Sequence, residues 1–280
     1  MTYEWIRFEI VDKIATLTFN NPTAKNALST PMRLEVADAI RRLRAGEDTK
    51  DLDVRALILQ GAGDAFCAGG DVKAMTKIRS AAEIRNRIID AHTWYDDLLN
   101  LEMPVIAAVR GPAFGAGLSM ALAADLIVAT PKASFCSVFP RMGLIPDLGL
   151  LHVLPRLIGL QRAKEMMFSA RAVGGEEAKA IGLIYEVVEE DQLDVSVQAL
   201  AKQFTNASMT AIGITKALLN RSFETDLKTM NELEAMGQGA AANTQAHHGA
   251  VEQFLSKKPL SYGGFKKSDW VNGGKKGAAT

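Results

Sequence analysis

The stretch Phe66-Cys67-Ala68-Gly69-Gly70-Asp71 decides the fold, together with the stretch Gly111-Pro112-Ala113-Phe114-Gly115-Ala116-Gly117 about 45 residues further on. Each follows an apolar run that is typical of a strand, Arg55 to Gln60 before the first and Pro104 to Val109 before the second. Glycines at a strand exit allow a sharp turn that leaves backbone N–H groups unpaired. We therefore predict two facing turns whose N–H groups would hold an oxyanion.

Neither turn has the spacing of a nucleotide-binding loop. The dinucleotide fingerprint requires Gly or Ala three residues after Gly117, where this chain has Met120, and no Gly-Lys-Ser/Thr follows either turn. The residues Leu118 to Ala124 are typical of a small-residue helix, and a helix N-terminus favours negative charge. An oxyanion therefore fits the pair of turns, and a purely structural bend remains the alternative for each turn taken alone.

Composition and charge describe an ordinary globular chain. Its 280 residues carry 32 Lys and Arg against 32 Asp and Glu, so bulk charge recruits neither nucleic acid nor an anionic membrane. The hydrophobic share of 48% is enough for a large core. The two cysteines, Cys67 and Cys136, lack CxxC spacing, which argues against a disulfide framework or a metal site and favours a reducing compartment.

No segment has the pattern of a targeting signal or a membrane span. The N-terminus lacks the basic-then-apolar order of a secretory signal, and the longest apolar run, Leu118 to Ala129, is interrupted by Asp125. The C-terminal Ala278-Ala279-Thr280 is not a peroxisomal address. We expect a cytoplasmic protein without a membrane partner.

Short β-branched runs alternate with amphipathic helices to about residue 190, which indicates an α/β fold. One helix is expected to have Thr30 as its N-cap and Pro31 in its first turn and to end near Gly46, and a short one covers Glu176 to Ile181. Continuous apolar runs predict strands that are covered on both faces. The predicted strands are Ile14 to Phe19, Ala56 to Gln60, Val105 to Val109, Leu126 to Ala129 and Ile184 to Val188.

The last third of the chain lacks the alternation of strands and helices. Gln192 to Leu255 has helical patterns without a strand signal, and the Gly- and Lys-rich residues after Tyr262 are typical of a loosely held tail. We predict a core over 1–200, a helical region over 201–262 and a flexible tail over 263–280.

Four ordered blocks carry a resemblance to a known family. The chain resembles the enoyl-CoA hydratase/isomerase superfamily, also called crotonases, over about residues 10 to 190, and Phe254 and Lys257 extend the match. The blocks are Asn21-Pro22-Thr23-Ala24-Lys25-Asn26-Ala27-Leu28, Ala65 to Lys73, Gly111 to Asp125, and Gly143-Leu144-Ile145-Pro146-Asp147-Leu148-Gly149 running on to Gly159.

The resemblance implies a fold, an assembly and a ligand. It implies a crotonase-like spiral of ββα units with a C-terminal helical region, assembled as homotrimers or as dimers of trimers. It also implies an acyl-CoA substrate, so that coenzyme A is part of the substrate and no separate cofactor or metal is needed.

Residue by residue, the resemblance assigns the two oxyanion donors to the N–H groups of Gly70 and Ala116. The Ala68 carbonyl would accept from the adenine amine, and lysines would line the pantetheine and phosphate path, although a surface lysine is usually only a solvated charge. Lys257, together with Phe254, would reach the phosphates of CoA, bound either to the same subunit or to a neighbouring one. The substrate-binding residues implied or predicted are Ala24, Lys25, Ala68, Asp71, Lys73, Ser119, Phe139, Leu144, Phe254 and Lys257.

The departures from the family pattern concern the acid and base groups. At the positions where family hydratases carry two glutamates, this chain has Ser119 and Phe139, neither of which is a general base at neutral pH. Asp147 is at the position of the acid/base aspartate of several isomerase branches, and the local sequence resembles the ring-epoxide isomerase of phenylacetate degradation and the Δ3,Δ2-enoyl-CoA isomerases. We predict that Asp147 moves a proton along an enoyl chain, with its pKa raised by apolar neighbours that include Leu144.

Several alternatives remain open at this stage. Asp147 could be only an N-cap, Cys67 fits core packing better than a nucleophilic role, and the histidines, of which His152 is the least certain, fit packing or solvent. Other crotonase chemistry would be hydration through Ser119, or dehalogenation or thioester cleavage with Asp147 as nucleophile. A CoA-binding protein without turnover is the remaining class. The acyl group, the double-bond position, the pathway and the choice between trimer and hexamer are left undetermined.

Overall fold

The central layer is a six-stranded sheet. The computed structural model describes residues 2–46 and 53–271. Its large sheet has the order β1-β2-β3-β4-β6-β9, with β1 and β2 antiparallel and every later pair parallel. Its strands are β1 (Ile6–Val11), β2 (Ile14–Phe19), β3 (Ala56–Gly61), β4 (Val105–Val109), β6 (Leu126–Ala129) and β9 (Glu186–Val187).

A smaller sheet is built from the connections of the large one. Its three strands, each of three residues, are β5 (Pro112–Phe114), β7 (Ser134–Cys136) and β8 (Ala172–Gly174), in that order. The alternation of strands and helices confirms the predicted α/β class. The predicted strands are confirmed, except that Ile184 to Val188 shrinks to the two residues of β9. The strands of the small sheet were missed because runs of three residues have no readable period.

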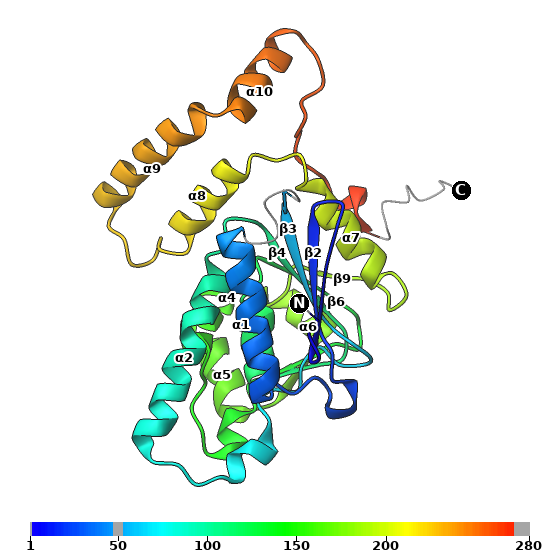
Figure 1. Cartoon of the computed structure of the whole chain (residues 1–280), viewed down its shortest axis with the longest axis vertical. Coiled ribbons are helices and arrows are strands. Elements are labelled where there is room, and N and C mark those ends of the chain that lie inside the picture. Colours follow the sequence, from blue (N-terminus) through cyan, green and yellow to red (C-terminus); the bar gives the residue numbers. More distant parts are fainter. Residues whose placement is uncertain (1, 47–52, 272–280) are drawn as a thin grey trace.

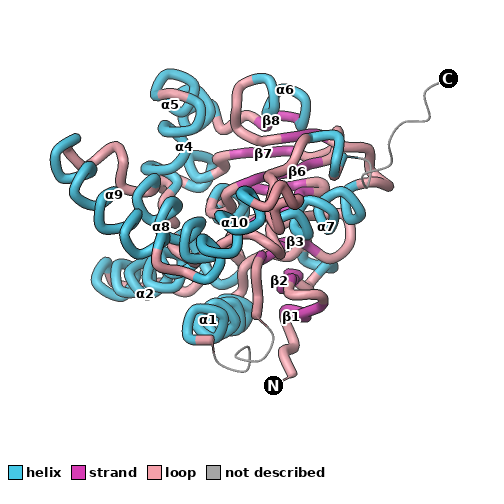
Figure 2. The backbone as a smooth tube through the Cα atoms, turned by 90° about the horizontal axis from the view of Figure 1, so that it is seen from above, coloured by secondary structure: helices cyan, strands magenta, loops and turns pink. Residues whose placement is uncertain are grey.

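The middle strands of the large sheet are buried on both faces, as the continuous apolar runs predict, whereas the edge strand β1 has one exposed face. Along β3, Leu57 and Leu59 join the core under the N-terminal helices, whereas Ala56 and Ile58 join a second core under α7 (Leu193–Gln203). Figure 2 shows α1 and α2 on one side of the strands and α7 on the other. This alternation follows from the two-residue period of a strand.

Two helices carry residues that matter for the site. In α1 (Thr30–Ala45) the N-cap is Ser29, whose hydroxyl accepts from the Met32 N–H, so the predicted cap at Thr30 was one residue late. Two hydroxyl residues in a row give the same sequence signal, and only the backbone angles separate them. The helix α2 (Ala81–Leu99) starts with a capping box between Ser80 and Glu83.

The remaining helices follow the predicted order. The helical end after Gln192 is confirmed, and Figure 1 shows α8, α9 and α10 as an arm that leaves the body. Neither α9 nor α10 has a buried residue. None of the helices in the described ranges is long and apolar enough to cross a membrane. The bounds are α3 (Ala116–Leu122), α4 (Leu150–Ile158), α5 (Leu160–Ser169), α6 (Gly175–Ala180), α8 (Met209–Leu219), α9 (Leu227–Ala242) and α10 (Gln245–Leu255).

The chain after the arm returns to the body. Trp270 is fully buried and stacks on Tyr185, and Phe265 packs edge-on against Phe204. The predicted loose tail is therefore wrong for 265–271, because two aromatic side chains anchor this segment. The rest of the predicted tail, 272–280, lies outside the described residues. The predicted domain boundary near residue 200 stays a prediction.

Candidate active site

The two glycine-rich turns lie against one another. The N–H of Cys67 donates to the Pro112 carbonyl at 3.0 Å, and the N–H of Phe114 donates to the Cys67 carbonyl at 3.0 Å. The Cys67 and Ala113 backbones therefore form a parallel bridge. This pairing fixes the end of the first turn beside the start of α3, as the sequence predicts.

Two glycines allow this close approach. A Cβ atom on Gly117 would lie 2.1 Å from the Cys67 carbonyl oxygen, and one on Gly69 would lie 2.8 Å from the Phe114 carbonyl oxygen. Gly69 also has a φ of +105°, which L side chains rarely adopt. A larger residue at either position would push the two backbones apart.

The amides assigned as oxyanion donors line one cavity. Gly70 and Ala116 both line a cavity of about 1030 Å³, and neither N–H donates a hydrogen bond within the described ranges. Ala116 is the first residue of α3, where backbone N–H groups have no partner within the helix and are available to a ligand. The arrangement can accept a carbonyl oxygen that becomes negative.

Asp147 lines the same cavity, and its carboxylate lacks a full set of partners. Its Oδ1 atom is buried and has no hydrogen-bond partner among the described residues. Burial raises the pKa of this carboxyl, whereas the nearby charges of His92 and Arg33 lower it. A carboxyl group with a raised pKa beside free donors is suited to proton transfer near neutral pH.

The backbone around Asp147 argues against the capping role. The N-cap of α4 is Gly149, and no side chain caps this helix. Leu148 and Gly149 have φ values of 46° and 69°, so the chain turns sharply just before the helix. The carboxylate of Asp147 therefore remains in the cavity wall.

Ser119 lies behind the wall. It is fully buried, it is not among the residues that line the cavity, and its hydroxyl donates to the Asp147 carbonyl at 3.0 Å. The Tyr95 hydroxyl donates to the Ser119 carbonyl at 3.1 Å. Direct contact of Ser119 with a substrate does not fit this placement. The residue holds the loop of Asp147 instead, and no sequence signal could show that contact.

Phe139 and Leu144 have different places. Phe139 is buried behind Gly115 and is not a lining residue, whereas Leu144 lines the cavity and is half-exposed. Only Leu144 is placed to touch a ligand directly. Phe139 contributes an apolar backing to the second turn.

The residues predicted for the CoA path gather beside the first turn. The Ala68 N–H donates to the Lys25 carbonyl at 2.9 Å, which places Lys25 and its neighbour Ala24 beside Ala68. The buried Asn26 amide donates to two carbonyls of the 62–65 segment and fixes this arrangement. Their contacts with CoA stay predictions.

The segment after Gly70 is also part of this region. Asp71 lines the cavity and accepts from the Lys73 N–H at 3.0 Å, which caps the short 3-10 helix Val72–Thr76. The Lys73 side chain is exposed beside it. By contrast, Phe254 and Lys257 are exposed at the end of α10 and do not line the cavity of their own chain.

The structure adds cavity residues that the sequence reasoning missed. His92 on α2 and His152 on α4 were assigned to packing or solvent, yet both line the cavity, and so does Arg33 on α1. These residues come from different helices, so only the tertiary fold brings them together. His152 also lies 3.8 Å from Glu224.

Cys67 is a packed residue, as predicted. It is fully buried, and burial raises the pKa of its thiol to about 12, so the thiol stays neutral. Within the part of the chain that the structure describes, no group of three His, Cys, Asp or Glu residues could hold a metal ion.

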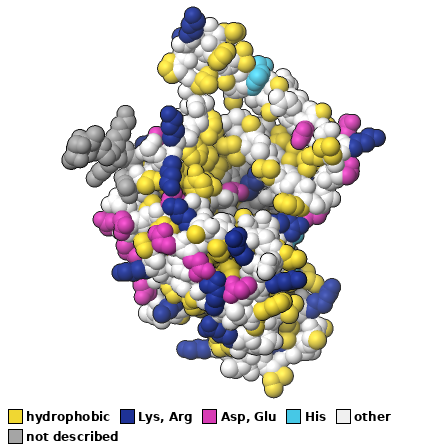
Figure 3. Space-filling model, turned by 180° about the vertical axis from the view of Figure 1, so that it is seen from behind, with side chains coloured by type: hydrophobic (Ala, Val, Ile, Leu, Met, Phe, Trp, Pro, Cys, Tyr) yellow, Lys and Arg dark blue, Asp and Glu magenta, His cyan; other side chains and the backbone are white. Residues whose placement is uncertain are grey.

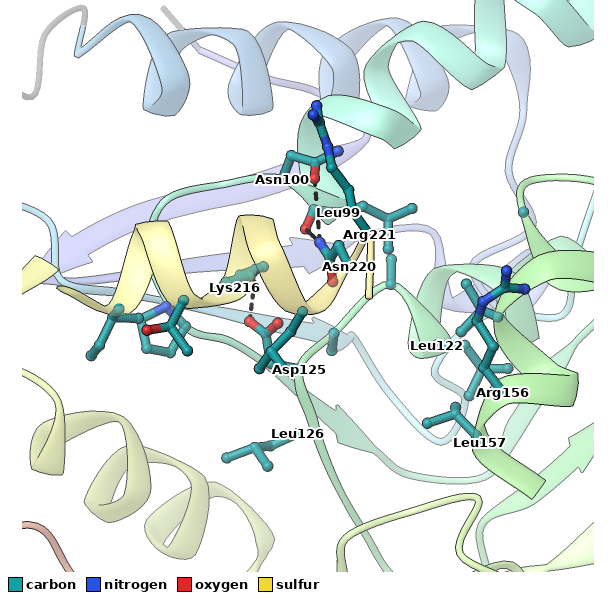
Figure 4. Close-up of a pocket in the computed structure, with 18 of the residues that line it drawn as sticks. Leu99, Asn100, Leu122, Asp125, Leu126, Arg156, Leu157, Lys216, Asn220 and Arg221 are labelled. Atoms are coloured by element: carbon teal, nitrogen blue, oxygen red, sulfur yellow. Dashed lines mark hydrogen bonds and ion pairs between the residues drawn. The ribbon is translucent and has the colours of Figure 1, made fainter. Parts of the chain in front are cut away.

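A second hollow lies between the arm and the body. This groove, of about 910 Å³, is visible in Figure 3 below the arm, with hydrophobic side chains along it. Asp125 lies in its wall, and its carboxylate accepts from Lys216 of α8 at 2.7 Å (Figure 4). The same carboxylate accepts from the Val105 N–H at 2.7 Å. The ion pair joins α8 of the arm to the residue that precedes β6, and the bond from Val105 links the same carboxylate to β4.

Comparison with known proteins decides the family. The family model described as Enoyl-CoA hydratase/isomerase matches residues 9–265. The chain belongs to the enoyl-CoA hydratase/isomerase family. It is therefore an enzyme of this family with the crotonase-like fold that the resemblance implied.

Individual relatives of both reaction types are similar to this family member. It is 32% identical to the crotonyl-CoA hydratase of Syntrophomonas wolfei, over 94% of this chain and 99% of that protein. It is 29% identical to the 1,2-epoxyphenylacetyl-CoA isomerase of Escherichia coli K12, over 93% and 99%. The crystal structure of an enoyl-CoA hydratase/isomerase from Cupriavidus metallidurans CH34 superposes with a TM-score of 0.89 at 38% identity, covering 95% of this chain and 98% of that one.

Proposed function

We propose that this enzyme is an enoyl-CoA isomerase that moves a Δ3 double bond to the Δ2 position. The observation that carries the proposal is the placement of one incompletely partnered carboxylate, Asp147, in the same cavity as the free amides of Gly70 and Ala116. A double-bond shift needs one base that returns the proton it takes, and it needs no positioned water.

The reaction steps follow from these groups. The thioester oxygen of a 3-enoyl-CoA accepts hydrogen bonds from the N–H groups of Gly70 and Ala116. The Asp147 carboxylate takes a proton from C2, and the electron pair moves into a dienolate whose negative oxygen the two amides stabilise. The protonated Asp147 then gives the proton to C4, which leaves the double bond between C2 and C3.

Hydration is the second candidate, favoured by relatives such as the crotonyl-CoA hydratase. Of the residues that line the cavity, only Asp71 and Asp147 carry carboxylates, and Asp71 caps its own helix. The Ser119 hydroxyl already donates to a carbonyl. A hydratase reaction would therefore have Asp147 as the one carboxylate of the cavity wall that does not cap its own helix.

A direct assay separates the candidates. We expect 3-hexenoyl-CoA to develop the absorbance of a conjugated thioester, and 2-hexenoyl-CoA to keep it. Loss of that absorbance from 2-hexenoyl-CoA would establish hydration instead. Tight binding of CoA without conversion of either compound would favour a non-catalytic binder or a more specialised crotonase reaction.

We also propose that the enzyme assembles as a trimer or a pair of trimers through its arm. Large apolar side chains are exposed on α9 and α10, and no residue of either helix is fully buried in its own chain. Burying such surface is the main driving force of association. Light scattering should give three or six chains, and a stable monomer would contradict the assembly. The exposed residues are Leu227, Met236, Phe254 and Leu255.

A further inference from the structure

The cavity around Asp147 has a strongly cationic part. Five Lys or Arg side chains and two His side chains line it, against the two carboxylates of Asp71 and Asp147. They come from α1, from the segment before α2, from α2 itself and from α4. The basic residues are Arg33, Lys77, Arg79, Arg85, Arg87, His92 and His152.

Arg33 lies within electrostatic reach of the reacting carboxylate. Its Nε atom is buried without a hydrogen-bond partner among the described residues, and its Nη2 donates to the Thr30 hydroxyl at 3.2 Å. Burial lowers the pKa of this guanidinium. The positive charges of Arg87 and Arg79 lower it further, whereas Asp147 raises it. The arginines are therefore close enough to repel one another.

Carboxylates of the protein do not neutralise this group. In the described ranges, no ion pair joins Arg33, Arg79 or Arg87 to an acidic side chain. Glu83 lies near Lys77 and Arg79, but its carboxylate accepts from Ser80 in the capping box. These positive charges outnumber the carboxylates around the cavity, so the cavity is suited to an anionic ligand.

The ligand's anion could lie in CoA or in the acyl group. The residues predicted for the CoA path lie beside the first turn, whereas the arginines come from α1 and α2. The same cavity is lined by Ile84, Ile88 and Leu144, which suit an aliphatic chain. Arginine binds a carboxylate with two parallel hydrogen bonds, which suits the end of such a chain.

We propose that the preferred substrate carries a carboxylate at the far end of its acyl chain and that Arg33 and Arg87 bind this carboxylate. This inference rests on the proposed isomerase function, because it names the substrate class of the same site.

A matched pair of substrates tests it. The compounds are 3-hexenedioyl-CoA, which ends in a carboxylate, and 3-hexenoyl-CoA, which has the same chain length and ends in a methyl group. We expect kcat/KM to be at least about tenfold higher for the first, the size of one charge-assisted hydrogen bond. Arg87→Gln and Arg33→Gln should each reduce this preference about tenfold, and Arg33→Lys should restore part of it.

The control is Arg162→Gln, since Arg162 is exposed on α5 and lines neither hollow. It should keep the full preference for 3-hexenedioyl-CoA. Circular dichroism of each variant excludes loss of fold, and inhibition by free CoA reports contacts with the phosphates.

Three results would overturn the inference. Conversion of both compounds with equal kcat/KM would refute the acyl carboxylate and leave the isomerase function intact. Equal losses for both compounds in the Arg87 variant, with weaker inhibition by free CoA, would assign the arginines to CoA phosphates. Conversion of neither compound would contradict the proposed function, and the inference would fall with it.

Discussion

Two aspartates in adjacent hollows have the same chemistry and different surroundings. Burial raises the pKa of both Asp125 and Asp147. Asp125, in the groove under the arm, accepts from Lys216 and from a backbone N–H, whereas the buried Oδ1 of Asp147 accepts from no described residue. The hydrogen-bond partners of a buried carboxylate therefore show whether it forms a structural ion pair or is available to a substrate. Its burial alone does not show this.

The largest expected effect is on catalysis. Asp147→Asn should lower kcat about 10³-fold, within the range for loss of a general base, and change the affinity for free CoA little. Asp125→Asn should leave kcat within about threefold, because Asp125 is in the other hollow. The measurement is the conversion of 3-hexenoyl-CoA by each variant. Full activity of Asp147→Asn would refute the assignment.

For stability, the comparison predicts that the ion pair of Asp125 matters more than Asp147, the reverse of the order for catalysis. Lys216→Met removes the cation that pairs with Asp125 and should lower the free energy of unfolding by about 1–3 kcal/mol. Asp125 keeps partial contact with water, which limits the loss. Lys164→Met, at an exposed position on α5, is the matched control. Equal urea midpoints for the two variants would show that the ion pair does not hold the arm.

Removing the charge of Asp147 should stabilise the fold. Burial raises the pKa of Asp147 in the folded state, so the folded protein holds this proton more tightly than the unfolded chain does. The free energy of unfolding therefore falls as pH rises from the ordinary aspartate pKa through the folded pKa. At neutral pH, Asp147→Asn should therefore raise the free energy of unfolding by on the order of 1 kcal/mol. The gain should vanish in acid, below the ordinary aspartate pKa. Thermal unfolding at several pH values provides the measurement, and a loss at neutral pH would contradict it.

The smallest expected effect is a shift in pH dependence. Activity should rise with pH as Asp147 ionises, and the midpoint should lie above that of an ordinary aspartate because burial raises its pKa. Arg33 lowers this pKa, so Arg33→Gln should move the midpoint of kcat/KM for 3-hexenoyl-CoA to higher pH. An unchanged profile would show that the two charges do not interact.

Much of the fold was readable because its signals are local. Apolar runs such as Val105–Val109 mark strands covered on both faces, and Gly46 marks the end of α1. Trp270 could not be placed from sequence, because it packs into the second core and stacks on Tyr185, and both Tyr185 and the other buried residues of that core are distant in the chain. The composition of that segment indicated a loose tail, and one stacked aromatic pair outweighs it.

The site was predictable in part for the same reason. The turns at Gly70 and Ala116 have a glycine signal, and the position of Asp147 came from the family resemblance. The remaining contacts are tertiary: Ser119 turns its hydroxyl to the loop of Asp147, and Arg33 and His92 reach the cavity from separate helices. The sequence pattern of a single segment cannot predict such contacts between separate elements.

Hydrogen exchange during turnover tests the central claim most directly. The enzyme and 3-hexenoyl-CoA are incubated in D2O, and the position of deuterium in the product is determined by NMR, with Asp147→Asn and Asp125→Asn in parallel. We predict 2-hexenoyl-CoA from the native enzyme and from Asp125→Asn, with the deuterium that the product takes from solvent located at C4, and formation of this product about 10³-fold more slowly by Asp147→Asn. Product from Asp147→Asn at the native rate, or addition of water as the main reaction, would contradict the account.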